Sequence, residues 1–252
     1  MALTRCEAIV VRTYPLGDTS RIAVLYSREF GLVRGVAKGA RAARSRFGAA
    51  LEPLSRVDVV LYRKDGRDLD LLSKVEVLED WRPVDFARVT HAQGVIEFVD
   101  RLVWEAEHEP RLYDLVRTAL RVIAGAPPAA LTSVTLAFQL QAAALLGYRP
   151  ELVHCAACGR DTQGTRCFAP ARGGVVCESC APGETMCVTA SPEALSGLAR
   201  LAAVPLAELV PFEPVRAGEM LRLVELHLKT HFHRFAGLKS LAMLLSLESA
   251  LA

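Results

Sequence analysis

Four cysteines near the middle of the chain have the spacing of a metal site. They form two C-x-x-C pairs, Cys155 with Cys158 and Cys177 with Cys180, and 18 residues separate the pairs. Two intervening residues let one tight turn direct two thiolates at a single ion, and two such turns complete a tetrahedral shell. Two disulfides or four buried thiols are the alternatives. We expect a Zn²⁺ site that uses all four cysteines.

The composition of this site indicates a structural metal. A catalytic zinc keeps one position open for water, whereas four thiolates close the shell. Zinc deaminases need an H-x-E element and many zinc hydrolases need H-E-x-x-H, and the sequence contains neither. It also lacks a Walker A motif, a dinucleotide fingerprint and a nucleophile elbow. We therefore assign no catalytic residue and expect a protein that is not an enzyme.

A second metal site is a weaker alternative. His227 and His231 lie four residues apart in a predicted helix, which is a spacing that can hold an ion. No third ligand accompanies them, so we expect an exposed polar stripe instead.

A basic stretch between residues 30 and 51 is the second informative feature. It contains no acidic residue, and Ala, Gly and Ser fill most of the positions between its cations. Guanidinium groups suit phosphate oxygens, and small residues allow a partner to approach the backbone closely. A solvated, flexible loop is the alternative. We expect nucleic-acid contacts from the five cations of this stretch, which are Arg34, Lys38, Arg41, Arg44 and Arg46.

The distribution of charge agrees with this expectation. The chain has 252 residues and a formal net charge of +2. Residues 1–82 carry 15 Lys and Arg against 11 Asp and Glu, and residues 83–252 carry 15 against 17. The first part, at +4, therefore suits a polyanion better than the second part, at −2.

The first 80 residues have the pattern of a small β-barrel. Five runs rich in β-branched and apolar residues are predicted as strands, at 7–13, 21–26, 32–37, 57–63 and 69–77. Five strands with a longer insertion between the third and fourth indicate an OB fold, and an SH3-like barrel is the alternative. Aromatic residues of this part could stack bases, although none is assigned that role: Tyr14, Tyr26, Phe30, Phe47 and Tyr62.

From residue 83 onward, apolar residues recur at the spacing of about 3.6 residues that is typical of helices. No charged residue occurs between Arg121 and Arg149, but polar residues such as Gln139 and Gln141 argue against a membrane span. We predict the central helix of a soluble bundle at 131–146, a helix capped by Ser191, and a longer helix over 216–234. The expected fold is a multidomain α+β protein. It comprises an OB-fold barrel at 1–82, a helical domain at 83–150 and 186–252, and a zinc ribbon inserted at 151–185.

The remaining cysteines, Cys6, Cys167 and Cys187, are predicted to be small buried hydrophobic residues. The chain begins without the apolar segment of a secretion signal. We therefore expect a reducing compartment, the cytoplasm, and no association with membranes.

Several motifs in sequence order resemble the RecO family of bacterial recombination mediators. They are Ala8-Ile9-Val10-Val11-Arg12, Gly17-Asp18-Thr19-Ser20-Arg21, Arg28-Glu29-Phe30-Gly31, Ala37-Lys38-Gly39-Ala40-Arg41, Ser45-Arg46, Leu51-Glu52-Pro53, Gly173-Gly174-Val175-Val176-Cys177 and Leu238-Lys239-Ser240. The resemblance covers nearly the whole chain. It departs from the usual pattern in the basic loop, which is poorer in lysine and proline.

The resemblance implies the same fold and a function in DNA repair and recombination. It implies binding of single- and double-stranded DNA, annealing of complementary strands, and, together with RecR, assistance in loading RecA onto strands coated with single-stranded DNA-binding protein. It places the protein at the nucleoid. A zinc-ribbon adaptor that docks proteins and contacts DNA only incidentally is the competing hypothesis.

Overall fold

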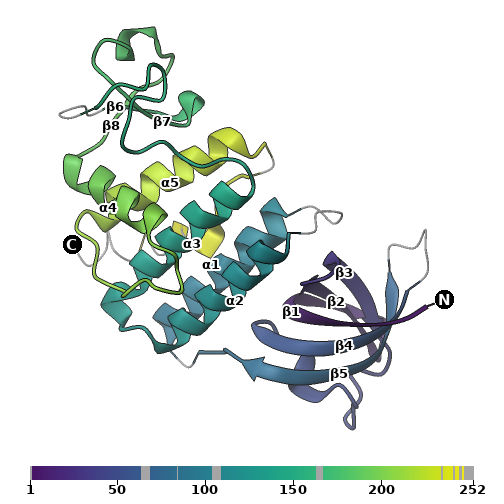
Figure 1. Cartoon of the computed structure of the whole chain (residues 1–252). Helices are drawn as coiled ribbons and strands as arrows, with labels where there is room; N and C mark the ends of the chain where they lie inside the picture. Colours follow the sequence, from purple (N-terminus) through teal and green to yellow (C-terminus); the bar gives the residue numbers. More distant parts are fainter. Residues whose placement is uncertain are drawn as a thin grey trace. The chain divides into compact units, whose positions relative to one another are not determined.

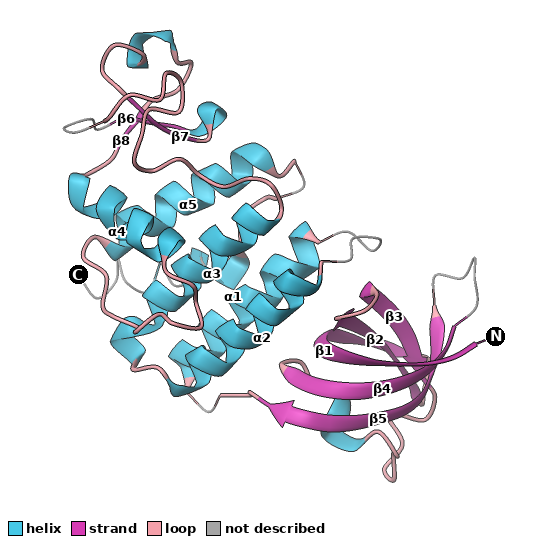
Figure 2. Cartoon of the chain, viewed as in Figure 1, coloured by secondary structure: helices cyan, strands magenta, loops and turns pink. Residues whose placement is uncertain are grey.

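The computed structural model describes residues 2–63, 69–83, 85–103, 109–162, 167–233, 235–240, 242–243 and 246. The chain divides into two compact units. The first unit comprises residues 1–84 and 96–124, and the second comprises residues 85–95 and 125–252. Figure 1 labels the elements of both units, and Figure 2 separates strands from helices. The predicted domain boundaries at residues 82, 151 and 185 stay predictions.

The first unit contains a closed five-stranded barrel. Its strands are β1 (Ala2–Leu16), β2 (Ser20–Ser27), β3 (Gly31–Ala37), β4 (Ser55–Arg63) and β5 (Asp70–Asp80). They are hydrogen-bonded in the order β1-β2-β3-β5-β4, and β4 pairs with β1 to close the barrel. Only β3 and β5 run parallel among these pairs. This topology confirms the predicted OB-type barrel.

Side chains along each strand point alternately into and out of the barrel, and the inward ones form its core. The inward residues are small or β-branched, as in Ala8, Val10, Val57 and Val59, and all four are fully buried. A 3₁₀ helix, η1 (Gly48–Leu51), forms the end of the basic stretch and adds buried apolar side chains to the same core. The segment between β3 and β4 is therefore anchored at its far end.

A β-bulge in β1 reverses the alternation of its last residues. The register with β2 shifts between Val10 and Arg12. Before the bulge, Ala8 and Val10 face inward. After the bulge, Thr13 pairs with the inward-facing Ala23, so that Tyr14 faces outward and is 41% exposed.

Two helical segments belong to the same unit as the barrel. They are the second half of α1 (Phe86–Leu102) and nearly all of α2 (Pro110–Gly125). Tyr113 of α2 is fully buried, and its ring centre lies 5.9 Å from that of Tyr26 on β2. Burial raises the pKa of Tyr113 to about 12.

The second unit is a helical bundle. It contains the first turns of α1, then η2 (Pro128–Ala130), α3 (Leu131–Leu145), α4 (Pro192–Ala203) and α5 (Ala217–His231). The Ser191 side chain accepts a hydrogen bond from the amide of Ala194, which confirms the predicted cap of α4. The predicted helix over 216–234 ends earlier, at His231, because Phe232 adopts an extended conformation.

Helix α3 is the centre of this bundle. The stretch Pro128–Leu145 is the only helix of the described residues that is long and apolar enough to cross a membrane, and 72% of it is buried within the protein. Some of its polar side chains have internal partners, whereas the buried amide of Gln139 has none among the described residues. Gln141 donates to the backbone oxygens of Leu201 and Val204, and Thr135 bonds His91. These contacts agree with the predicted central helix.

A small three-stranded sheet is inserted between α3 and α4. Its strands are β6 (Cys167–Ala169), β7 (Gly174–Val176) and β8 (Val188–Thr189), in the order β7-β6-β8. The 3₁₀ helices η3 (Pro170–Arg172) and η4 (Ala181–Gly183) complete the segment. The entering chain lies so close to β7 that a Cβ at Gly174 would overlap the backbone oxygen of Glu151.

Candidate metal centre and candidate nucleic-acid interface

The four predicted metal ligands come together. The sulfur atoms of Cys155, Cys158, Cys177 and Cys180 all lie within 4.8 Å of one another. The sulfurs of Cys158 and Cys177 are 3.8 Å apart. A tetrahedron with Zn–S distances of about 2.3 Å has edges of about 3.8 Å, so this spacing fits a tetrahedral ion. None of the four is in a disulfide.

Two turns position these sulfurs. In the first, the amide of Gly159 donates to the carbonyl oxygen of Cys155, and Gly159 has a φ of +73° that suits glycine. In the second, the amides of Cys180 and Ala181 both donate to the carbonyl oxygen of Cys177. The spacing of the two C-x-x-C pairs therefore follows from ordinary backbone hydrogen bonds.

The electrostatics of the cluster favour a bound cation. The amide of Cys177 donates to the sulfur of Cys155 and lowers the pKa of this thiol to about 6. Hydrogen bonds with the neighbouring thiols of Cys177 and Cys158 raise the pKa of Cys180 to about 12. A divalent cation would stabilise all four groups as thiolates.

The other cysteines differ from their prediction in part. Cys6 is buried in the barrel core, as predicted. Cys187 is exposed, which contradicts the prediction, and it forms a disulfide with the buried Cys167. The partner strands explain this pairing, because Cys167 lies on β6 and Cys187 directly precedes β8, which pairs with β6. Strand pairing of this kind is not visible in cysteine spacing.

His227 and His231 do not form the predicted exposed stripe. His227 is 2% exposed, and its Nε2 lies 2.8 Å from the carbonyl oxygen of Tyr148. The Nε2 of His231 lies 3.0 Å from the carbonyl oxygen of Pro170. Burial lowers the pKa of His227 to about 4. His227 thus connects α5 to the segment that precedes the ribbon, and His231 connects α5 to η3 within the ribbon, which corrects the prediction.

All five predicted DNA-contact residues are exposed. Arg34 lies on β3, and the other four follow it in the loop between β3 and η1, residues 38–47, which we call the basic loop. Arg41 is anchored by its Nη1, which donates to the carbonyl oxygen of Gly17 at 2.8 Å, and Arg46 lies over the ring of Phe47. Within the described residues, the basic loop contains no carboxylate, and no ion pair involves Lys38, Arg41, Arg44 or Arg46.

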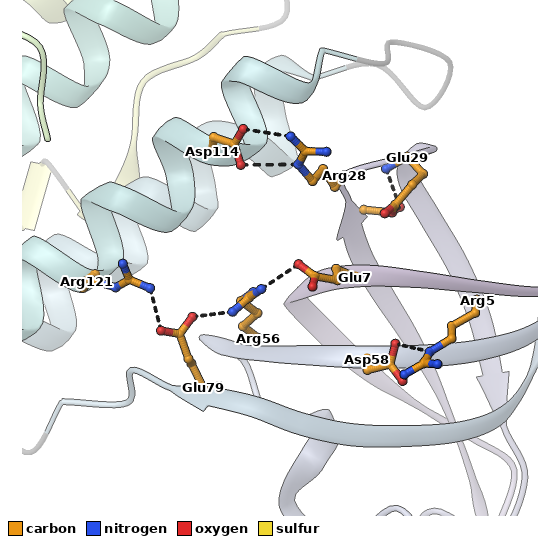
Figure 3. A network of polar contacts seen from close by, with 10 residues as sticks. Arg5, Glu7, Arg28, Glu29, Arg56, Asp58, Glu79, Asp114 and Arg121 are labelled. Carbon is orange, nitrogen blue, oxygen red and sulfur yellow. Dashed lines mark hydrogen bonds and ion pairs between the residues drawn. The ribbon is translucent and has the colours of Figure 1, made fainter.

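Other cations of the barrel are neutralised by carboxylates. Figure 3 shows Arg56 between Glu7 and Glu79, at 2.6 and 2.7 Å. In the same network Arg121 of α2 pairs with Glu79, and Arg28 pairs with Asp114 of α2. Further pairs among the described residues are Arg5–Asp58, Arg12–Asp100, Arg21–Glu52, Arg63–Asp70, Lys74–Glu76 and Arg82–Asp80. The sequence pattern does not reveal these partners, because they lie up to 88 residues apart.

Comparison with known proteins identifies the family. A family model described as recombination protein O N terminal matches residues 1–81, and one described as recombination protein O C terminal matches residues 83–242. The chain belongs to the RecO family. Similar relatives are named DNA repair protein RecO, and the family assignment therefore carries a role in DNA repair.

Three of these RecO relatives show the extent of the similarity. The protein of a Nocardioides species is 38% identical over 251 residues, which is 95% of this chain and 98% of the relative. The protein of Rubrobacter xylanophilus is 37% identical over 92% of this chain and 93% of the relative. The protein of Symbiobacterium thermophilum is 38% identical over 71% of this chain and 72% of the relative. The expected resemblance to RecO is thus confirmed.

Proposed function

We propose that this RecO-family chain binds single- and double-stranded DNA without enzymatic activity and anneals complementary strands. With RecR as partner, it would assist the loading of RecA onto strands coated with single-stranded DNA-binding protein. We place this activity in the cytoplasm, at the nucleoid. Its role in DNA repair makes DNA the polyanion for which the cations of the first unit are best suited.

One observation carries the proposal. The cations of the basic loop are exposed and have no carboxylate partner among the described residues, whereas the pairs named above neutralise other cations of the barrel. A free guanidinium or ammonium group can replace the counterions of a phosphate, and a paired one must first lose its carboxylate. The basic loop is therefore the part of the barrel best prepared to bind a phosphate backbone.

Annealing follows from charge neutralisation. Two complementary strands repel each other through their phosphates, and a cationic surface that holds one strand lowers this repulsion as the second approaches. No nucleotide hydrolysis is needed for this step.

The cysteine cluster supports a second part of the proposal. We assign Zn²⁺ to Cys155, Cys158, Cys177 and Cys180 as a structural ion. Zinc supplies a tetrahedral centre for four thiolates, and its binding free energy holds small folds of this type together.

The test of DNA binding is the salt dependence of affinity for single-stranded DNA. Replacing Lys38, Arg41 and Arg46 by Ala should weaken binding and reduce the slope of log K against log[salt] by about 0.7 for each lost phosphate contact. The matched control replaces Arg5, Lys74 and Arg82 by Ala, which removes the same charge from paired positions. If both variants show the wild-type slope, the basic loop does not bind phosphate.

A further inference from the structure

An apolar row crosses the outside of the barrel. Strand pairing places Tyr14 opposite Ile22, Ile22 opposite Val36, and Val36 opposite Leu71. Leu71 in turn pairs with Tyr62, and Tyr62 pairs with Leu3. We call these six residues the outer row: Tyr14, Ile22, Val36, Leu71, Tyr62 and Leu3. Each of the five strands contributes at least one of them.

The alternation of the strands turns this row away from the core. Its neighbours in sequence, Ala23, Ala37, Leu61 and Leu72, are core residues. The two ends of the row are open, since Tyr14 is 41% exposed, Tyr62 is 38% exposed and Leu3 is 63% exposed. The inner members are partly exposed. Successive strands are about 4.8 Å apart, so the row from Tyr14 to Tyr62 spans roughly 19 Å along the surface.

The exposed rings differ from the other aromatic residues of the barrel. Tyr26 and Phe47 are buried, and Phe30 lies under the guanidinium of Arg63. Tyr14 also has a guanidinium near it, because the Cζ of Arg12 lies 5.0 Å from its ring centre. It nevertheless keeps two fifths of its surface open. Tyr14 and Tyr62 are therefore the rings of this barrel that are best placed to stack with a ligand.

Cations border the outer row. Lys38 follows Val36 by two residues and begins the basic loop. Arg41 of this loop is hydrogen-bonded to the β1–β2 turn, through its side chain to Gly17 and through its amide to Thr19. This turn begins directly after Leu16, and Tyr14 lies two residues before Leu16 on β1. Apolar rings next to unpaired cations are complementary to bases joined by phosphates.

We propose that the outer row is a base-stacking platform for single-stranded DNA, in which Tyr14 and Tyr62 each stack on a base while the basic loop holds the adjoining phosphates. This inference rests on the proposed DNA binding and extends it. It assigns affinity for bases to the row and affinity for phosphates to the loop. Sheet surfaces with exposed aromatic side chains bind bases in this way in other nucleic-acid-binding folds.

If the outer row stacks bases, the full-length protein should bind a strand that carries bases more tightly than one that has only the sugar-phosphate backbone. The test compares binding of an oligothymidylate with that of an abasic strand of the same length and charge. The wild-type protein should bind the oligothymidylate about 5- to 150-fold more tightly for each stacked base, since stacking contributes about 1–3 kcal/mol per base. This comparison needs no variant.

Variants test whether Tyr14 and Tyr62 cause the preference for the strand that carries bases. The change Tyr14→Ala with Tyr62→Ala should bring the ratio of the two affinities close to one and leave the salt slope unchanged. Tyr14→Phe with Tyr62→Phe should keep the ratio, because the rings remain. Tyr148→Ala should also keep it, since Tyr148 is similarly exposed, at 40%, but lies outside the barrel.

The outcomes separate this inference from the proposed function. Equal affinity of the wild-type protein for both strands would overturn the platform while DNA binding stands. A ratio that survives the double Ala change would overturn the assignment to Tyr14 and Tyr62. Binding of neither strand would overturn both proposals.

Discussion

The thiols of the four-cysteine cluster lie too close together for all four to ionise without a cation among them. Their sulfurs are within 4.8 Å of one another, and neighbouring thiols raise the pKa of Cys180 to about 12. Thiolates at this separation repel strongly unless a cation neutralises them. The cluster could therefore hold a metal ion, which would stabilise all four groups as thiolates.

We predict one Zn²⁺ per chain in the purified protein. Cys177→Ser should lower the zinc content and increase amide hydrogen exchange in β6, β7 and β8, because zinc binding supplies folding free energy to such sites. Metal analysis by mass spectrometry measures the first effect. Cys6→Ala is the control, since it removes a free cysteine of the barrel core and should leave the zinc content unchanged. Full zinc content in the Cys177→Ser variant would contradict the assignment.

Among the elements, β3 and β5 pack closely where they meet in the barrel. This parallel pair has only the registers Gly35–Asp70 and Val36–Leu71. A Cβ at Gly35 would lie 2.5 Å from Cδ2 of Leu72. The absence of a side chain at Gly35 thus lets the barrel close.

Gly35→Ala should therefore destabilise the protein, by about 1–3 kcal/mol, which is typical of overpacking. Urea unfolding followed by circular dichroism measures the change. Gly125→Ala is the matched control, because nothing lies within 4 Å of a Cβ added at the end of α2. It should be neutral or stabilising by less than about 1 kcal/mol. Equal stability of both variants would show that β3 and β5 can separate without cost.

The elements also show what the sequence can predict. The β-branched runs predict the five strands, Pro192 after Ser191 predicts the start of α4, and the cysteine spacing predicts the cluster. The face of Tyr14 was not predictable, because a bulge between Val10 and Arg12 reverses the alternation that would otherwise direct its ring inward. The pairing of Arg28 with Asp114 depends on tertiary contacts and has no local signal.

In the molecule as a whole, the positive net charge is concentrated in residues 1–82. Residues 1–82 carry a net charge of +4, and the rest of the chain carries −2. Ion pairs within the first unit neutralise many of its cations, whereas those of the basic loop have no carboxylate partner among the described residues. DNA binding should therefore depend on a few side chains of the loop and only weakly on the overall charge.

Strand annealing tests this claim most directly. The measurement is the annealing rate of two complementary oligonucleotides with the wild-type protein, across a salt series, beside the loop variant and the paired-position variant described above. We predict acceleration by the wild-type protein that falls with salt, little acceleration by the variant lacking Lys38, Arg41 and Arg46, and nearly wild-type acceleration by the variant lacking Arg5, Lys74 and Arg82. Equal acceleration by all three proteins would contradict the account.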